Sequence, residues 1–193
     1  MKKLLAICRQ DLKTHQVGFF LLALVTLFFI LRFPSLFEPH WYGDEGIYQV
    51  VGRAIREGRV LYQGIWDNKP PLLYAVYATF NGDLFSVRLA ALVLAILTLL
   101  VFFRLAKCLF KKKESLYVST ILFTVLFGLP LLEGNIANAE NFMLLPILAS
   151  AILVLNYILS PRPYTLFIAG LLLALAFLIK TVAIFDLIAF TLT

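Results

Sequence analysis

Long uncharged stretches recur along this chain of 193 residues, and they constrain its fold more than any other feature. Each runs for about 15 to 20 residues, close to the ~20 that a helix needs to cross ~30 Å of hydrocarbon. The composition agrees, because 62% of the residues are hydrophobic and only 15% are charged, whereas soluble domains are roughly half apolar. The sequence therefore predicts an all-α integral membrane protein, a polytopic helical bundle.

The predicted spans cover residues 14–33, 84–106, 115–132, 141–160, 163–180 and 181–193. The last stretch reaches Thr193 without a flanking charge or turn, so we interpret it as incomplete. Residues 1–193 would then be the N-terminal part of one transmembrane domain in a longer, truncated protein. The first span could instead be a signal peptide, but its apolar core is long and no cleavage site precedes Pro34, which favours a retained anchor.

Lysine and arginine residues predict the orientation of the spans, since these bases are enriched in cytoplasmic segments. They cluster at Lys2, Lys3, Arg9, Lys13, Arg104, Lys107, Lys111 to Lys113 and Arg162. The loop from Glu133 to Glu140 has none. We therefore expect a multi-pass protein of the cell (plasma or inner) membrane, with the loop of residues 34–83 extracytoplasmic. The net charge of +6 is then a topology signal, and nucleic acid is not an expected partner.

The two cysteines, Cys8 and Cys108, both fall on the predicted cytoplasmic side. Cytoplasmic thiols are kept reduced, so no disulfide is expected, and a pair this far apart in sequence has no metal-site spacing.

The outer loop, residues 34–83, has a helical periodicity of its own. Apolar residues recur at i, i+3, i+4, i+7 and i+8, at Ile47, Val50, Val51, Ala54 and Ile55. This pattern predicts a short amphipathic helix that lies in the membrane interface and ends near Gly58. Two prolines follow Lys69 and prevent a helix from running through it, so a second interfacial helix is predicted over Leu72 to Phe80.

Two adjacent acids, Asp44 and Glu45, stand at the start of the first interfacial helix, where the macrodipole favours negative charge. Asp44 could serve only as the N-cap, but capping does not account for the second acid. The tyrosines and tryptophans of this loop are also typical of an interfacial aromatic belt. A single lysine such as Lys69 commonly extends to the membrane surface without further function.

In order and spacing, these residues resemble the first extracytoplasmic loop of the GT-C superfamily. The matching residues are Asp44-Glu45, Tyr48, Gly58, Leu61-Tyr62, Asp67-Asn68-Lys69-Pro70-Pro71-Leu72 and Tyr74. Weaker likeness continues through Arg88, Asn138-Ala139-Glu140, Gly170 and Lys180. Within the superfamily, the chain is similar to protein O-mannosyltransferases and to the lipid A aminoarabinose transferases.

This resemblance implies a GT-C-like bundle and a membrane glycosyltransferase. Such an enzyme moves a sugar from a polyprenyl-phosphate carrier to a protein, lipid or glycan acceptor on the extracytoplasmic face, with a general base and inversion. The expected partners are that donor, the acceptor and membrane lipids. Two other classes stay open: a transporter or flippase subunit, and a non-catalytic membrane scaffold.

The resemblance also implies roles for individual residues. Asp44 matches the catalytic base, with Glu45 beside it. Lys69 matches a cation for the leaving lipid phosphate. Further candidates for binding the lipid phosphate or the substrate are Arg88, Tyr62 and Glu140. Some relatives bind a metal with an acid that directly precedes the lysine. This chain has Asn68 at that position, so the resemblance does not define a metal site here. No cofactor is predicted, and a divalent metal is the alternative.

Two further ionisable residues lie toward the end of the chain. Lys180 is expected to end the fifth span at the outer surface. Asp186 falls inside the sixth apolar stretch, where an ionised side chain costs ~3 kcal/mol on insertion scales, so a functional role is the default expectation.

Overall fold

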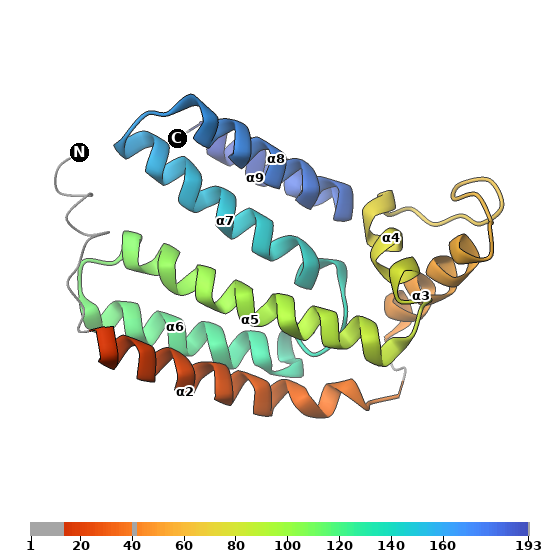
Figure 1. Ribbon diagram of the computed structural model, residues 1–193, viewed down its shortest axis with the longest axis horizontal. Helices are drawn as coiled ribbons and strands as arrows, with labels where there is room; N and C mark the ends of the chain where they lie inside the picture. Colours follow the sequence, from red (N-terminus) through yellow and green to blue (C-terminus); the bar gives the residue numbers. More distant parts are fainter. Residues whose placement is uncertain (1–13, 40–41, 193) are drawn as a thin grey trace.

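The computed structural model describes residues 14–39 and 42–192, and the regular elements within these ranges are all helices. The bundle consists of α2 (Thr14–Arg32), α5 (Leu84–Leu109), α6 (Lys113–Gly128), α7 (Ala139–Leu159), α8 (Pro163–Ile179) and α9 (Ile184–Thr191) (Figure 1). The predicted basic tail, with Lys2, Lys3, Arg9 and Lys13, lies outside the described residues, as do Cys8 and Thr193.

The bundle helices coincide with the predicted spans to within a few residues at most ends. Among the described residues, the helices over His15–Leu36, Leu84–Leu109 and Ala139–Leu159 are long and apolar enough to cross a membrane, while those over Pro163–Ile179 and Thr181–Thr191 are shorter. A helix satisfies its own backbone hydrogen bonds, which hydrocarbon requires. The prediction of an all-α polytopic membrane protein is confirmed.

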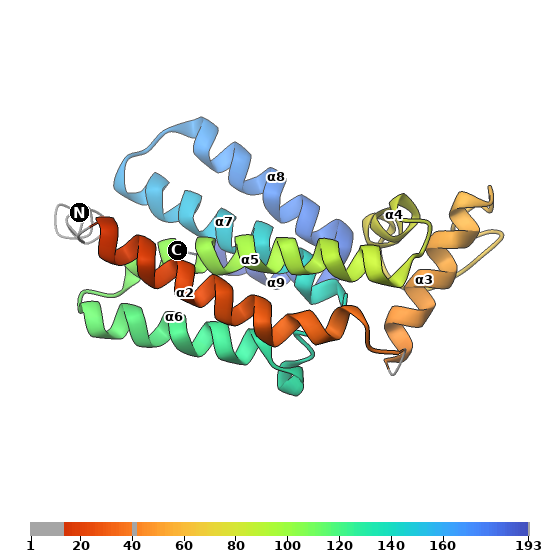
Figure 2. The ribbon, with the colours of Figure 1, turned by 60° about the horizontal axis from the view of Figure 1, so that its bottom comes forward.

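Consecutive bundle helices run in opposite directions, so their connections alternate between two ends of the bundle (Figures 1 and 2). One end holds the basic connections, with Lys112 before α6 and Arg162 before α8. The other end holds the loop of residues 129–138 with Glu133, and the turn η3 (Thr181–Ala183) that follows Lys180. The bases Lys112 and Arg162 thus lie at one end, as the sequence pattern predicts. The acids Glu133 and Glu140 lie at the other, called the acidic end below, where Lys180 and Arg88 are paired with acids.

The direction in which this axis crosses the membrane can be tested by cysteine labelling. We expect a cysteine at Val60, which is exposed beside α3, to react with an impermeant reagent from the extracytoplasmic side only. A cysteine at the exposed Lys112 should react from the cytoplasmic side only. The measurement uses intact cells and inverted vesicles, in a background that lacks Cys8 and Cys108. Labelling of position 60 from the cytoplasmic side would reverse the orientation.

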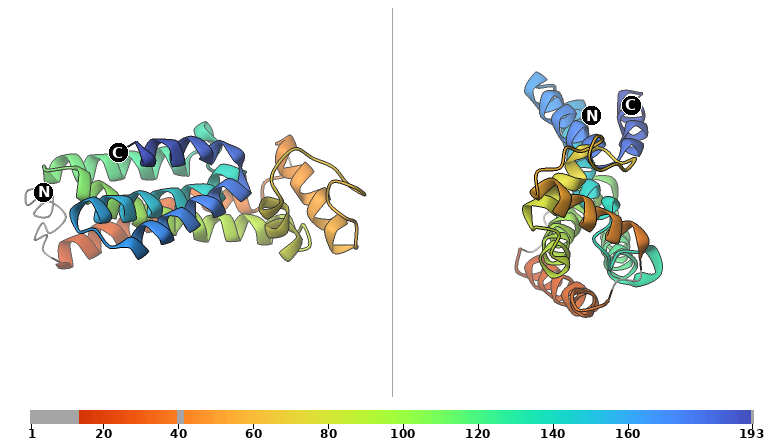
Figure 3. Two further views of the ribbon diagram at one scale, coloured as in Figure 1. Left: turned by 90° about the horizontal axis from the view of Figure 1, so that it is seen from above. Right: turned by 90° about the vertical axis from the view of Figure 1, so that its right-hand side faces the viewer.

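Two shorter helices, α3 (Gly43–Arg56) and α4 (Pro71–Thr79), lie beyond the acidic end of the bundle (Figures 1 and 3). They correspond to the two helices that the sequence predicts in the loop of residues 34–83. Gly58 follows α3 with φ +88°, a left-handed conformation that ends a helix. Pro71 is the first residue of α4, where its fixed φ fits a helix and its missing N–H is no loss.

The buried face of α3 differs from the predicted apolar stripe. Within that stripe Val51 and Ala54 are buried, whereas Ile47 and Val50 are exposed. The buried side is instead the one that carries Glu45, Tyr48, Gln49 and Gly52. The reason is the contact with α4: a Cβ at Gly52 would lie 2.7 Å from Tyr77 Cβ, so only glycine lets the two helices approach this closely.

Helices α3 and α4 are packed onto the acidic end of the bundle. Tyr74 and Tyr77 of α4 are fully buried and share one hydrophobic cluster with Phe142 of α7 and Leu173 of α8. Aromatic side chains bury more apolar area than any others, so this cluster is the main support of α4. The loop helices therefore have a fixed position relative to the spans.

Candidate active site

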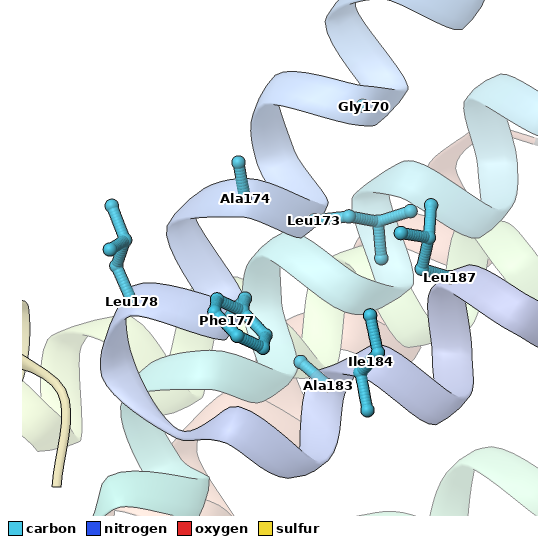
Figure 4. Close-up of a pocket in the computed structure, with 8 residues that line it drawn as sticks. All are labelled: Gly170, Leu173, Ala174, Phe177, Leu178, Ala183, Ile184 and Leu187. Atoms are coloured by element: carbon cyan, nitrogen blue, oxygen red, sulfur yellow. The ribbon is translucent and has the colours of Figure 1, made fainter.

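One apolar groove lies between α8 and α9 (Figure 4). It has a volume of about 360 Å³, and its lining includes Gly170, Leu173, Phe177, Ile184 and Leu187. None of its lining side chains can donate or accept a proton. A reaction that needs an acidic or basic group must therefore take place outside this groove. The charged residues predicted for the site lie on and around α3 and α4.

Asp44 occupies the first turn of α3, and its side chain is 41% exposed. The N-cap of this helix is Tyr42, without a side-chain cap, so Asp44 is not the N-cap. Its carboxylate oxygen Oδ2 accepts a hydrogen bond from the Tyr48 hydroxyl at 3.0 Å. The same oxygen lies 3.8 Å from Lys69 Nζ. A carboxylate and an ammonium group thus face each other from two different segments.

Lys69 comes from the loop between α3 and α4, and its side chain is 19% exposed. Its Nζ donates a hydrogen bond to Asn68 Oδ1 at 3.0 Å and lies 5.8 Å from the centre of the Tyr48 ring. Pro70 is extended and serves as the N-cap of α4. The rigid Pro70-Pro71 pair thus fixes where the lysine leaves the backbone.

Two tyrosines hold the backbone of Lys69 from both sides. The Tyr62 hydroxyl donates to the Lys69 carbonyl oxygen at 2.7 Å. The Lys69 N–H donates to the Tyr74 hydroxyl at 3.1 Å, and that hydroxyl in turn donates to the Asp67 carboxylate. Both main-chain groups of the lysine are therefore satisfied, and the loop that presents it is fixed without a regular element.

The tyrosines around this site act as hydrogen-bond donors because they stay protonated. Burial and the hydrogen bond to Asp44 raise the pKa of Tyr48 above its usual value. Burial and the bond to Asp67 do the same for the pKa of Tyr74. Burial, with a hydrogen bond to Glu133, raises the pKa of Tyr42 to about 12. At neutral pH these three tyrosine hydroxyls therefore keep their protons and can act as donors.

Glu45 points away from Asp44 and into the protein, with no exposed surface. Its two oxygens accept from Arg88, Oε1 from Nε at 2.9 Å and Oε2 from Nη2 at 2.6 Å. Oε1 also accepts from the backbone N–H of Ala137 at 3.0 Å. Arg88 Nη1 donates to the carbonyl oxygens of Ser35 and Glu38. This buried pair joins α3, α5 and two connecting segments.

Glu140 lies in the first turn of α7 and forms an ion pair with Lys180, which directly follows α8. Its side chain is half exposed. The charge of Glu140 is one of the lesser causes that raise the pKa of Tyr48 and of Tyr42, so it lies near the same site. Lys180 ends α8 at the acidic end of the bundle, as expected from the sequence.

The structure therefore divides the predicted site residues into two groups. It brings Asp44, Lys69 and Tyr62 together, with Glu140 nearby, and it places Glu45 and Arg88 in a separate buried pair. Within the described part of the chain, no group of three or more His, Cys, Asp or Glu side chains could hold a metal ion.

Sequence reasoning did not find the contacts of Tyr48 and Tyr74, which it took for members of an aromatic belt. Both are buried, and their hydroxyls bond Asp44 and Asp67. The spacing of Asp44 and Tyr48, four residues apart on a helix, is the signal that could have found the first contact.

A comparison with protein families gives one match. Residues 69–193, well over half of the chain, match the model of the dolichyl-phosphate-mannose-protein mannosyltransferase family. The chain belongs to this family. The protein is accordingly a membrane glycosyltransferase of the GT-C type. No curated protein and no solved structure matches the chain.

Membership in the mannosyltransferase family favours the enzyme over the transporter and the scaffold that the composition also allowed. The matched region begins at Lys69 and includes Arg88, Glu140 and Lys180. Asp44 and Glu45 precede the matched region, so any assignment of roles to them rests on the geometry of this structure. That geometry places Asp44, and not Glu45, opposite the first matched residue.

Proposed function

We propose that the protein transfers a sugar from a polyprenyl-phosphate carrier to an acceptor on the extracytoplasmic face of the cell membrane, with inversion at the anomeric carbon. The observation that carries this proposal is the approach of Asp44 and Lys69, at 3.8 Å, from two segments that are each fixed by hydrogen bonds. A transfer of this kind needs one group to accept a proton and one to balance a negative charge.

In the proposed reaction, the acceptor hydroxyl oxygen attacks the anomeric carbon and forms the new glycosidic bond. Asp44 accepts the proton of that hydroxyl. The bond between the anomeric carbon and the phosphate oxygen breaks, and the phosphate leaves with the electron pair. Lys69 stabilises the added negative charge of the phosphate, an interaction that is stronger in the transition state than in the ground state.

The contact between Asp44 and Lys69 is weak enough to be replaced by substrate. An ion pair with this exposure contributes at most about 1 kcal/mol. A donor phosphate can therefore take over Lys69 at a small cost, which leaves Asp44 free to approach the acceptor. Tyr62 would keep the lysine backbone in place during this exchange, and the pair of Glu140 and Lys180 would border the site.

Replacement of Lys69 by methionine tests the role of the cation. We expect Lys69→Met to slow the release of polyprenyl phosphate from polyprenyl-phosphate mannose by about 10- to 100-fold, since a hydrogen bond to a charged group contributes ~1.5–3 kcal/mol. Lys69→Arg should recover only part of the rate, because a planar guanidinium does not reproduce a point charge on the same stem. The measurement uses membranes with equal amounts of inserted protein.

The matched control for this experiment is Lys112→Met, which removes a lysine at the opposite end of the bundle and should leave the rate unchanged. Full activity of Lys69→Met would show that the lysine has no part in the chemistry and only extends to the membrane surface.

A further inference from the structure

Tyr48 contacts both Asp44 and Lys69. Its hydroxyl donates to Asp44 Oδ2 at 3.0 Å, and Lys69 Nζ lies 5.8 Å from the centre of its ring. Its side chain is buried, with only 1% of the residue exposed. A buried tyrosine normally finds a partner for its hydroxyl, but here the partner is a half-exposed carboxylate that faces the site.

We infer that Tyr48 is a positioning residue for the transfer reaction: its hydroxyl orients the Asp44 carboxylate, and its ring holds the Lys69 ammonium group opposite that carboxylate. This inference rests on the proposed function, because it assumes that Asp44 accepts the acceptor's proton.

The hydrogen bond determines which oxygen of Asp44 is available. Tyr48 engages Oδ2, and Lys69 lies near the same atom. Both of these contacts are made at Oδ2, so they leave Oδ1 on the other side of the carboxylate. A carboxylate held through one oxygen cannot rotate freely, so Oδ1 keeps a fixed direction and is the atom that would accept the proton. Fixed geometry of a reacting group is worth a large part of many enzymatic rate enhancements.

The ring of Tyr48 is itself held by its neighbours. It packs edge-on against Tyr74, with 6.1 Å between ring centres, and against Tyr77 at 5.6 Å. Tyr74 also bonds the backbone of Lys69. The same aromatic cluster therefore supports the acid from one side and the lysine from the other. A cation over the face of a tyrosine ring is attracted to it, which adds a direct contact between the ring and the lysine.

The competing explanation is that Tyr48 is only a core residue of the α3–α4 contact. The substitution Tyr48→Phe separates the two, because it keeps the ring and removes the hydroxyl alone. A positioning role predicts that kcat falls about 10-fold while KM for polyprenyl-phosphate mannose stays unchanged, since Lys69 keeps its ring contact. A core role predicts that kcat of the folded protein is unchanged.

The decisive experiment combines Tyr48→Phe with Asp44→Asn in a double-mutant cycle. If the hydroxyl acts through the carboxylate, Tyr48→Phe should lower kcat about 10-fold in the wild type and cause no further loss in the Asp44→Asn background. Equal losses in both backgrounds, or no loss in the wild type, would overturn the inference.

The control is Tyr77→Phe, a second buried tyrosine of the same cluster whose hydroxyl donates to the Ala137 carbonyl oxygen at 2.7 Å. It should leave kcat of the folded protein unchanged in both backgrounds. The two proposals fail separately: a fully active Asp44→Asn contradicts the proposed function, whereas an inactive Asp44→Asn with a fully active Tyr48→Phe contradicts only the role of Tyr48.

Discussion

Replacement of Asp44 by asparagine is expected to slow sugar transfer by at least about a hundredfold, the lower end of what a positioned general base contributes. Asparagine has the same shape and can still accept the hydrogen bond of Tyr48, but it cannot take up the acceptor's proton. The side chain is 41% exposed and lies on a short helix, so the substitution should leave the fold intact. The measurement is the transfer rate at saturating polyprenyl-phosphate mannose, at equal amounts of folded protein.

The matched control is Glu57→Gln, which removes a carboxylate at the opposite end of α3, where it is exposed. It should transfer sugar at the wild-type rate. If Asp44→Asn is as active as this control, Asp44 is not the base, and the proposed mechanism must be abandoned.

The helices were predictable because their signals are local. The spans follow from the length of apolar stretches, and α4 follows from two prolines that stop a helix at Lys69 and favour the start of a new one. Gly58 adopts the left-handed conformation that ends α3. Each of these signals is contained within one turn or one apolar run, so the sequence determines it without knowledge of the rest of the fold.

The orientation of α3 could not be predicted in the same way. Hydrophobic periodicity gives a helix an apolar side, but Ile47 and Val50 of that side are exposed. In a membrane protein, exposed apolar residues can contact lipid, so burial and hydrophobicity no longer coincide. The contact of Gly52 with Tyr77 decides the orientation, and it joins residues that are distant in sequence.

The sequence favours Asp44 over Glu45 as the base, but it does not identify the partner of Glu45. Adjacent residues on a helix point about 100° apart, so the two acids must face different surroundings. The sequence does not specify which of them meets Arg88, because that arginine is 43 residues away from Glu45. In the structure Glu45 is buried with Arg88, and we propose that this pair supports the site and takes no part in the chemistry.

If the pair of Glu45 and Arg88 supports the fold, its loss should lower the stability of the protein. We expect Arg88→Met to lower the free energy of unfolding by about 3–5 kcal/mol, because it leaves a buried carboxylate without its charged partner. The hydrogen bond from the Ala137 N–H to Glu45 would remain, together with the electrostatic attraction of the buried Arg32. The measurement is denaturant unfolding of the protein in detergent micelles. Arg53→Met, at an exposed arginine of α3, is the control and should change stability by less than about 1 kcal/mol.

A double variant separates the effect of the unpaired charge from that of lost packing. Glu45→Gln combined with Arg88→Met removes both charges, so it should be more stable than Arg88→Met alone, since neutral replacement of a buried pair is tolerated better than removal of one partner. The folded fraction of each variant should transfer sugar at a rate much closer to the wild type than Asp44→Asn does. A Glu45→Gln protein that is stable but inactive would move the catalytic role from Asp44 to Glu45.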